Sequence, residues 1–180
     1  MPDRDPYDPG HPPTLAHPEL AMPHRLDAID LRILKELQSD GRITNVALAQ
    51  RIGITPPPCL RRVRTLEEQG FIVGYNARLD PRLLGYDLTA FAMVGLHSQA
   101  EADLRAFENR VLAWPLVREC HMMSGETDFI LKCVAPDLTA FHDFVTRELT
   151  AAPNVATVKT SLAIRRVKEE TGLPIVVREG

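Results

Sequence analysis

The spacing of the apolar residues changes partway along the chain, and this change constrains the fold more than any other feature. Before residue 71, apolar side chains such as Ile29, Ile33 and Leu37 recur every three or four positions, which is typical of short amphipathic helices. After residue 87, short apolar runs alternate with helical patterns. A chain of 180 residues has room for two small domains, so we expect a helical domain followed by a mixed one.

The first half predicts three helices, and the first two have recognisable end signals. Asp27 is placed to cap the first helix, which ends at Gly41. Thr44 or Asn45 is placed to cap the second helix, which ends at Gly53. The sequence therefore predicts two short helices joined by a brief loop.

The third helix begins with three prolines directly after Thr55. We expect Thr55 to cap this helix, and prolines 56–58 are tolerated because amides in a first turn have no intrahelical acceptor. The helix is predicted to run to Gln69 and Gly70. The segment 71–75 then predicts a short strand.

Arginines are concentrated in this region. Five arginines and no acidic residue lie between Gly41 and Leu66, although the whole chain has a formal net charge of −3. These arginines are Arg42, Arg51, Arg61, Arg62 and Arg64. A solvated face normally mixes both signs of charge, so the window favours an anionic partner such as double-stranded DNA. The alternatives are a chance cluster on a solvated face and a three-helix bundle for oligomerisation.

The third helix separates an apolar face from an arginine face. On a helical wheel of about 100° per residue, Arg61, Arg64 and Pro57 lie opposite the apolar positions. The apolar positions are Cys59, Val63 and Leu66. Arg62 lies on the flank, where it is either a phosphate contact or a structural ion-pair partner. A short helix, a tight turn and a helix with outward arginines have the geometry of a helix-turn-helix, whose arginines meet guanine or phosphate.

The second half predicts an α+β domain. The expected elements are strands 88–96, 116–123, 128–135 and 155–167 and helices 101–114 and 138–149. The order βαββαβ is that of a ferredoxin-like domain, in which two helices cover one antiparallel sheet.

A polar loop joins the two middle strands. It consists of Ser124, Gly125, Glu126, Thr127 and Asp128. Gly125 would let backbone amides approach a carboxylate, and Asp128 or Glu126 would pair with an α-ammonium, so the loop has the chemistry of an amino-acid site. Thr160 on the last strand would add a hydroxyl. Glycine and aspartate are equally ordinary in a simple turn between strands, so from the residues alone both interpretations stay open.

Other classes of function find little support in the sequence. Three cysteines without CxxC spacing and histidines without metal-ligand spacing predict reduced thiols, a cytoplasmic location and no bound metal or cofactor. No apolar stretch approaches the roughly 20 residues of a membrane span. Ser124 and His121 lack a third catalytic partner, so we expect no enzymatic activity. The alternative is an enzyme, or its regulatory subunit, with an amino-acid-binding ferredoxin-like domain.

Several motifs in the same order resemble the leucine-responsive / asparagine-operon (Lrp/AsnC) family of regulators. In the first half they are Leu26-Asp-Ala-Ile-Asp30, Arg42-Ile-Thr-Asn45, Ile54-Thr-Pro-Pro-Pro-Cys59 and Leu66-Glu-Glu-Gln-Gly-Phe-Ile72. In the second half they are Glu119-Cys-His121 and Ser124-Gly-Glu-Thr-Asp-Phe129. The resemblance spans about residues 26–177. Pro57 departs from the pattern, because the family usually has a small polar residue there that would offer DNA a hydroxyl.

The resemblance implies a sequence-specific DNA-binding transcriptional regulator whose assembly or DNA affinity responds to a small effector, in this family an amino acid. It implies an N-terminal winged helix-turn-helix domain and a C-terminal ferredoxin-like (ACT-like) domain. It also implies dimers formed through the sheets, assembly into tetramers or octamers, and effectors bound where dimers meet. The expected DNA contacts are Arg42, Thr44, Asn45, Thr55, Pro57, Arg61, Arg62 and Arg64, and the expected effector contacts are Ser124, Gly125, Glu126, Thr127, Asp128 and Thr160.

These expectations divide the chain into five parts. Residues 1–24 hold seven of the fifteen prolines and show no periodicity, which predicts a disordered tail. The predicted parts are a disordered Pro-rich tail (1–25), a helix-turn-helix DNA-binding domain (26–77), a linker (78–87), an effector-binding and oligomerisation domain (88–168) and a C-terminal tail (169–180).

Overall fold

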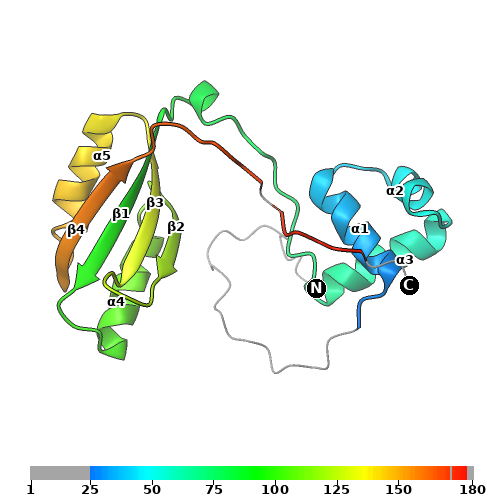
Figure 1. Ribbon diagram of the computed structural model, residues 1–180, viewed down its shortest axis with the longest axis horizontal. Coiled ribbons are helices and arrows are strands. Elements are labelled where there is room, and N and C mark those ends of the chain that lie inside the picture. Colours follow the sequence, from blue (N-terminus) through cyan, green and yellow to red (C-terminus); the bar gives the residue numbers. More distant parts are fainter. Residues whose placement is uncertain (1–24, 171, 178–180) are drawn as a thin grey trace, which may run out of the picture. The chain divides into compact units, whose positions relative to one another are not determined.

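The computed structural model describes residues 25–170 and 172–177, which form two compact units (Figure 1). The helical unit contains the described residues up to Ala77 together with 172–177, and the sheet unit contains Arg78–Glu170. The predicted disordered tail lies outside the described residues except for Arg25.

The helical unit contains the three predicted helices, α1 (Ala28–Ser39), α2 (Asn45–Ile52) and α3 (Pro56–Glu68). They enclose a small core whose fully or nearly fully buried members are Ile33, Leu48, Ala49, Ile52, Cys59 and Leu66. At the start of α1, the Asp27 carboxylate accepts a hydrogen bond from the Asp30 amide, and the Asp30 carboxylate accepts one from the Asp27 amide. This reciprocal cap fixes where α1 begins.

The turn between α2 and α3 is tight because Gly53 adopts a left-handed conformation (φ 77°, ψ 33°). The Ile54 amide donates to the Ala49 carbonyl over 3.0 Å, which closes the end of α2. A side chain at this φ would be strained, so glycine allows the second and third helices to follow each other with almost no loop.

The strand predicted over residues 71–75 is wrong. Among the described residues of the helical unit, none forms a strand, and Val73 is 97% exposed. An extended segment becomes a strand only when a neighbour satisfies its backbone groups. Residues 71–75 instead lie beside α3, where the Tyr75 hydroxyl donates to the Glu67 carboxylate over 2.9 Å.

The sheet unit has the predicted element order. Its elements are β1 (Leu88–Leu96), α4 (Glu101–Leu112), β2 (Val117–Met122), β3 (Phe129–Ala135), α5 (Leu138–Phe144), the π-helical turn η2 (Val145–Leu149) and β4 (Val155–Leu162), preceded by the 3-10 turn η1 (Arg82–Leu84). The strands pair antiparallel in the order β2-β3-β1-β4. This is the ferredoxin-like arrangement, with β1 and β3 in the centre and β2 and β4 at the edges (Figure 1).

Two predicted boundaries in the sheet unit need correction. The last strand ends at Leu162 instead of residue 167, because the hydrogen bond from Ala163 to Thr89 reaches the beginning of β1 and no further partner strand exists there in the described chain. The predicted helix 138–149 continues past α5 as a π-helical turn. In that turn the Thr150 hydroxyl donates back to the Val145 carbonyl, which competes with regular helical bonding.

One face of the sheet packs against α4 and α5. The residues of β1 and β3 that point to this face are buried, and they are Ala90, Ala92, Val94, Phe129, Leu131, Cys133 and Ala135. Phe107 and Trp114 from the α4 side pack edge to face with ring centroids 6.0 Å apart, and Trp114 packs on Phe144 of α5 at 5.4 Å. The aromatic rings therefore join both helices to the sheet.

All three thiols are expected to resist alkylation while the protein is folded. Burial raises the pKa of Cys59. Burial is also the main cause that raises the pKa values of Cys120 and Cys133 to about 11, with Glu108 adding to the shift of Cys120 and the Cys120 thiol to that of Cys133. Since the thiolate is the reactive form, few thiols react at about pH 8. Iodoacetamide labelling followed by mass spectrometry should show slow uptake by native protein and three labels after unfolding. Rapid labelling of Cys120 in native protein would mean that the edge strand β2 opens.

Candidate nucleic-acid interface and effector loop

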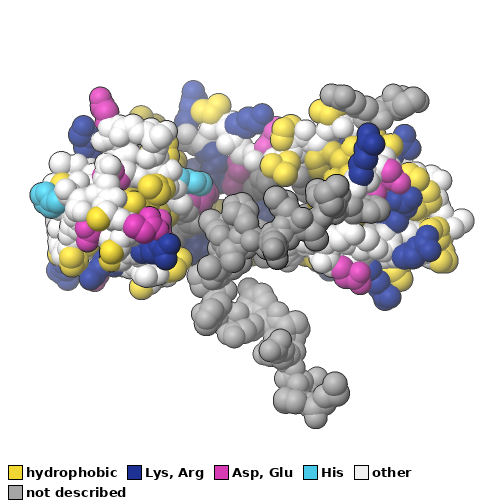
Figure 2. Space-filling view, turned by 90° about the horizontal axis from the view of Figure 1, so that it is seen from below, with side chains coloured by type: hydrophobic (Ala, Val, Ile, Leu, Met, Phe, Trp, Pro, Cys, Tyr) yellow, Lys and Arg dark blue, Asp and Glu magenta, His cyan; other side chains and the backbone are white. Residues whose placement is uncertain are grey.

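The outward face of α3 forms the candidate DNA interface. Pro57, Arg61 and Arg64 are exposed, as the helical wheel predicts, while Cys59 and Leu66 are buried. A shallow surface depression runs along this face, and its lining residues are Pro57, Leu60, Arg61, Arg64, Thr65 and Glu68. Lys and Arg side chains gather at several places on the helical unit in the view of Figure 2.

The start of α3 differs from the prediction in its capping. Thr55 is the N-cap, but its hydroxyl makes no capping hydrogen bond within the described chain. The reason is chemical: such a bond needs the amide of the second or third helical residue, and both are prolines without an N–H. The exposed Thr55 hydroxyl is thus left for another acceptor or donor, such as a phosphate.

Arg62 turns inward, which favours the ion-pair alternative over the phosphate contact. Its guanidinium lies 2.7 Å from Asp30 and 2.8 Å from Asp27. The Asp30 side chain is only 3% exposed, and its hydrogen bond raises the pKa of Arg62. Burial raises the pKa of Asp27, but bonds from the Asp30 amide and from Arg62 outweigh it, so that pKa lies below its ordinary value. Arg62 therefore fastens α3 to the start of α1.

The other predicted DNA contacts are divided between the surface and the interior. Arg42 and Thr44 are exposed, and the Thr44 hydroxyl caps α2 by accepting from Ala47 over 3.2 Å. Asn45 is half-buried, and its amide nitrogen donates to the Pro56 carbonyl over 2.8 Å. Asn45 thus links the beginnings of α2 and α3, and its expected contact with DNA stays a prediction. The contact with Pro56 was not predictable from spacing, because it depends on how the two helices cross.

Sequence reasoning missed Leu60 as a candidate interface residue. Leu60 is 40% exposed and lies on the outward face beside Arg61 and Arg64. An exposed apolar side chain on a helix that faces the major groove is suited to the methyl group of thymine. Its position on the wheel was the available signal, since it lies next to Arg61 and Arg64 and away from the buried Cys59.

The loop between β2 and β3 is a hairpin turn with a glycine at positive φ. The Met123 amide donates to the Asp128 carbonyl over 2.8 Å, which closes the turn. Gly125 has φ +138°, a value that side chains rarely adopt, and an added Cβ would find nothing within 4 Å among the described atoms. Ser124, Gly125 and Glu126 are exposed, whereas Thr127 is half-buried. The tip of the loop is therefore open to a small molecule.

Asp128 has a structural role that the sequence did not predict. One carboxylate oxygen accepts a bond from the Leu96 amide over 2.6 Å, and the other accepts from the Gln99 side chain over 2.7 Å. These bonds fasten the loop to the end of β1. An ionised carboxylate has about four acceptor positions, so Asp128 retains capacity for an ammonium group.

Thr160 does not join the loop within one chain. It lies on β4 opposite Ala92, whereas Asp128 lies beside Val94 on the other side of β1. Within one chain the structure thus places Thr160 apart from the loop, and its expected contact with an effector stays a prediction. The strand order separates them, and spacing along the sequence does not reveal strand order.

Within residues 25–170 and 172–177, no group of three or more His, Cys, Asp or Glu side chains is placed to hold a metal ion. None of the helices in this part of the chain is long and apolar enough to cross a membrane.

Comparisons with known proteins agree with this division into two units. Residues 26–73 match a winged helix-turn-helix DNA-binding model, and residues 89–173 match the Lrp/AsnC ligand binding domain. The leucine-responsive regulatory protein of Rhizobium meliloti (strain 1021) is 63% identical over 144 residues, which covers 80% of this chain and 92% of that protein. The protein of that name from Escherichia coli (strain K12) is 41% identical over 153 residues, or 85% of this chain and 93% of the other.

A solved structure supports the same assignment. A transcriptional regulator from Neisseria meningitidis, solved as a complex with L-Met, matches with a TM-score of 0.80 and 37% identity, covering 83% of this chain and 97% of that one. The chain belongs to the Lrp/AsnC family. It is a DNA-binding transcriptional regulator with an effector-binding domain.

Proposed function

We propose that this regulator reads DNA with the outward face of α3 and changes its DNA affinity when an amino acid binds the sheet unit. The observation that carries the proposal is the split of α3 into a buried face and an exposed face with Arg61 and Arg64. Pro57 and Leu60 extend the same exposed face, and Thr55 is exposed at the N-terminal end of α3. The protein works by binding and catalyses no reaction.

The proposed effector site is the loop Ser124–Asp128. Its exposed tip and positive-φ Gly125 favour close approach of a carboxylate to backbone amides. Glu126 is exposed and Asp128 has spare acceptor positions, so both are suited to an ammonium group. The Neisseria relative was solved with L-Met, and two relatives are named leucine-responsive, which favours an apolar amino acid. Gly125 and Asp128 are the residues on which this site depends most.

Self-association is proposed through the sheet face opposite α4 and α5. This face presents Phe91, Met93, Ile130 and Val134, and Phe91 is 39% exposed. Apolar side chains on an uncovered sheet face favour a partner sheet. A dimer, with further assembly into a tetramer or octamer, would bring residues of several chains together, Thr160 among them. We also propose the five-part division of the chain into a tail (1–25), a DNA-binding domain (26–77), a linker (78–87), an effector-binding and oligomerisation domain (88–168) and a C-terminal tail (169–180).

A mobility-shift assay with the DNA upstream of the protein's own gene tests the function. The protein should retard this fragment in the presence of excess nonspecific DNA, and L-leucine or L-methionine should change the affinity. If the migration of this fragment is unchanged at micromolar protein concentration, the DNA-binding role of α3 is contradicted. Unchanged affinity with all twenty amino acids would contradict the effector role while leaving DNA binding intact.

The substitution Asp128→Asn is expected to lower effector affinity by roughly 1.5–3 kcal/mol, the range for a hydrogen bond to a charged group. The amide keeps the shape and the bond from Leu96 but removes the charge that meets an ammonium. Isothermal titration of L-leucine into the wild type and the variant, each with and without DNA, measures this change. Linkage requires that DNA alters effector affinity as much as the effector alters DNA affinity. Equal affinities in both proteins would show that the loop is only a turn.

A further inference from the structure

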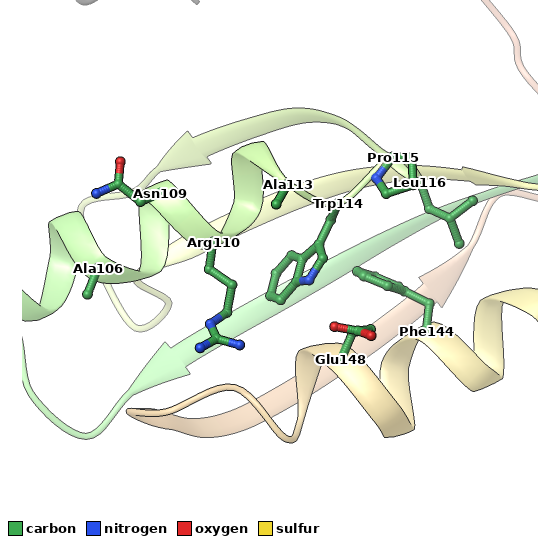
Figure 3. Close-up of a pocket in the computed structure, with 9 residues that line it drawn as sticks. All are labelled: Ala106, Asn109, Arg110, Ala113, Trp114, Pro115, Leu116, Phe144 and Glu148. Carbon is green, nitrogen blue, oxygen red and sulfur yellow. The ribbon is translucent and has the colours of Figure 1, made fainter. Parts of the chain in front are cut away.

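A groove between α4 and α5 takes no part in the proposed DNA and effector sites (Figure 3). Its volume is about 720 Å³, within the roughly 300–1,000 Å³ of small-molecule sites. Two small side chains line the groove, Ala106 of α4 and Ala113 directly after that helix. The packed rings of Trp114 and Phe144 form its floor and are 6% and 7% exposed.

Two opposite charges stand on opposite walls of this groove. Arg110 comes from the last turn of α4 and Glu148 from the π-helical turn after α5, and Figure 3 shows both side chains turned into the groove. Within the described residues, neither side chain forms an ion pair or a hydrogen bond. A guanidinium and a carboxylate that face each other without meeting leave room for a ligand with both charges.

We propose that this groove binds a free α-amino acid with an apolar side chain, at a site separate from the Ser124–Asp128 loop. Arg110 pairs with the α-carboxylate, because the guanidinium fork matches carboxylate geometry. Glu148 accepts hydrogen bonds from the α-ammonium, and the apolar side chain lies on Trp114 and Phe144. The apolar floor favours an apolar side chain over an acidic one, which would lose its hydration there.

The groove and the loop lie at opposite ends of β2. The groove includes Leu116, directly before the strand, whereas the loop follows Met122 at its other end. Six residues at about 3.4 Å each separate them by about 20 Å, too far for one amino acid to touch both. Occupancy of the groove would link α4 to α5 on the helix side of the sheet. The inference rests on the proposed function, and it adds a second amino-acid site to the proposed regulation.

Trp114 is the single tryptophan of the chain and lies in the floor of the groove, so its fluorescence is a probe of groove occupancy. L-leucine titrated into the full-length protein should change the emission saturably. N-acetyl-L-leucine, which lacks the ammonium, and L-leucine methyl ester, which lacks the carboxylate, should bind at least about tenfold more weakly. Absence of a saturable change with L-leucine would overturn the proposal.

Matched variants test the two charges. Arg110→Gln and Glu148→Gln should each weaken the L-leucine isotherm by about tenfold or more. The controls Arg105→Gln and Glu108→Gln remove the same charges from exposed positions of α4 outside the groove and should leave it unchanged. Circular dichroism confirms that each variant is folded.

The variant Asp128→Asn separates this site from the loop. The fluorescence isotherm should survive in Asp128→Asn even where the DNA response to L-leucine is lost. If Asp128→Asn abolishes the isotherm while Arg110→Gln and Glu148→Gln leave it intact, the groove proposal is overturned and the loop proposal stands.

Discussion

Replacing Arg62 with alanine should destabilise the helical unit by about 2–3 kcal/mol, more than removal of any other arginine of α3. The substitution leaves the Asp30 carboxylate, whose side chain is 3% exposed, without the guanidinium 2.7 Å away. Arg62 itself keeps 30% exposure, so water offsets part of the loss and the lower end of the range for buried pairs applies. Thermal unfolding followed by circular dichroism measures the change.

Two variants and one titration give the controls for Arg62→Ala. Arg64→Ala, at an exposed position, should stay within about 0.5 kcal/mol of wild type. Adding Asp30→Asn to Arg62→Ala should recover part of the stability, because a neutral amide needs no counter-ion.

The pKa of Asp27 is lowered by folding, so the stabilisation from its ionised carboxylate is present above its unfolded pKa of about 3.9. This stabilisation is lost as the pH falls through the folded value. Wild type and Arg62→Ala should therefore converge in acid, and equal stability at neutral pH would contradict the structural role.

The element order could be predicted because its signals are local. Asp27 and Thr44 cap their helices as their positions indicate, and Gly53 takes the left-handed conformation that ends α2. The alternation along β3 appears directly as alternating burial. The missing cap bond of Thr55 was also predictable, since prolines lack the N–H that it needs. Each of these features depends on residues within one helical turn or one strand.

The functional side chains were harder to place because their partners lie far along the chain. Arg62 meets Asp30 across 32 positions, and Asp128 meets Leu96 across 32. Strand boundaries failed for a related reason, because residues 71–75 and 163–167 have no partner strand among the described residues that continues the pairing. Residue type and spacing predicted which side chains matter, while tertiary packing decides what each of them touches.

The double substitution of Arg61 and Arg64 by alanine should weaken binding to the specific DNA site at least about thirtyfold without unfolding the helical unit. Each lost arginine contact with a guanine costs about 1–3 kcal/mol, so two contacts exceed about 2 kcal/mol. Both side chains are exposed and opposite the buried Cys59 and Leu66, which is why stability should not change. Fluorescence anisotropy with labelled DNA measures the affinity over a series of salt concentrations.

The salt series separates two roles for these arginines. Loss of a phosphate contact lowers the salt dependence by about 0.9 for each charge removed and weakens binding to all sequences alike. Loss of a base contact leaves the salt dependence nearly unchanged and relaxes discrimination at one base pair. Arg32→Ala, on the exposed side of α1, removes one arginine from the same unit and serves as the control for net charge. If the double variant binds as tightly as Arg32→Ala, α3 is not the helix that reads DNA.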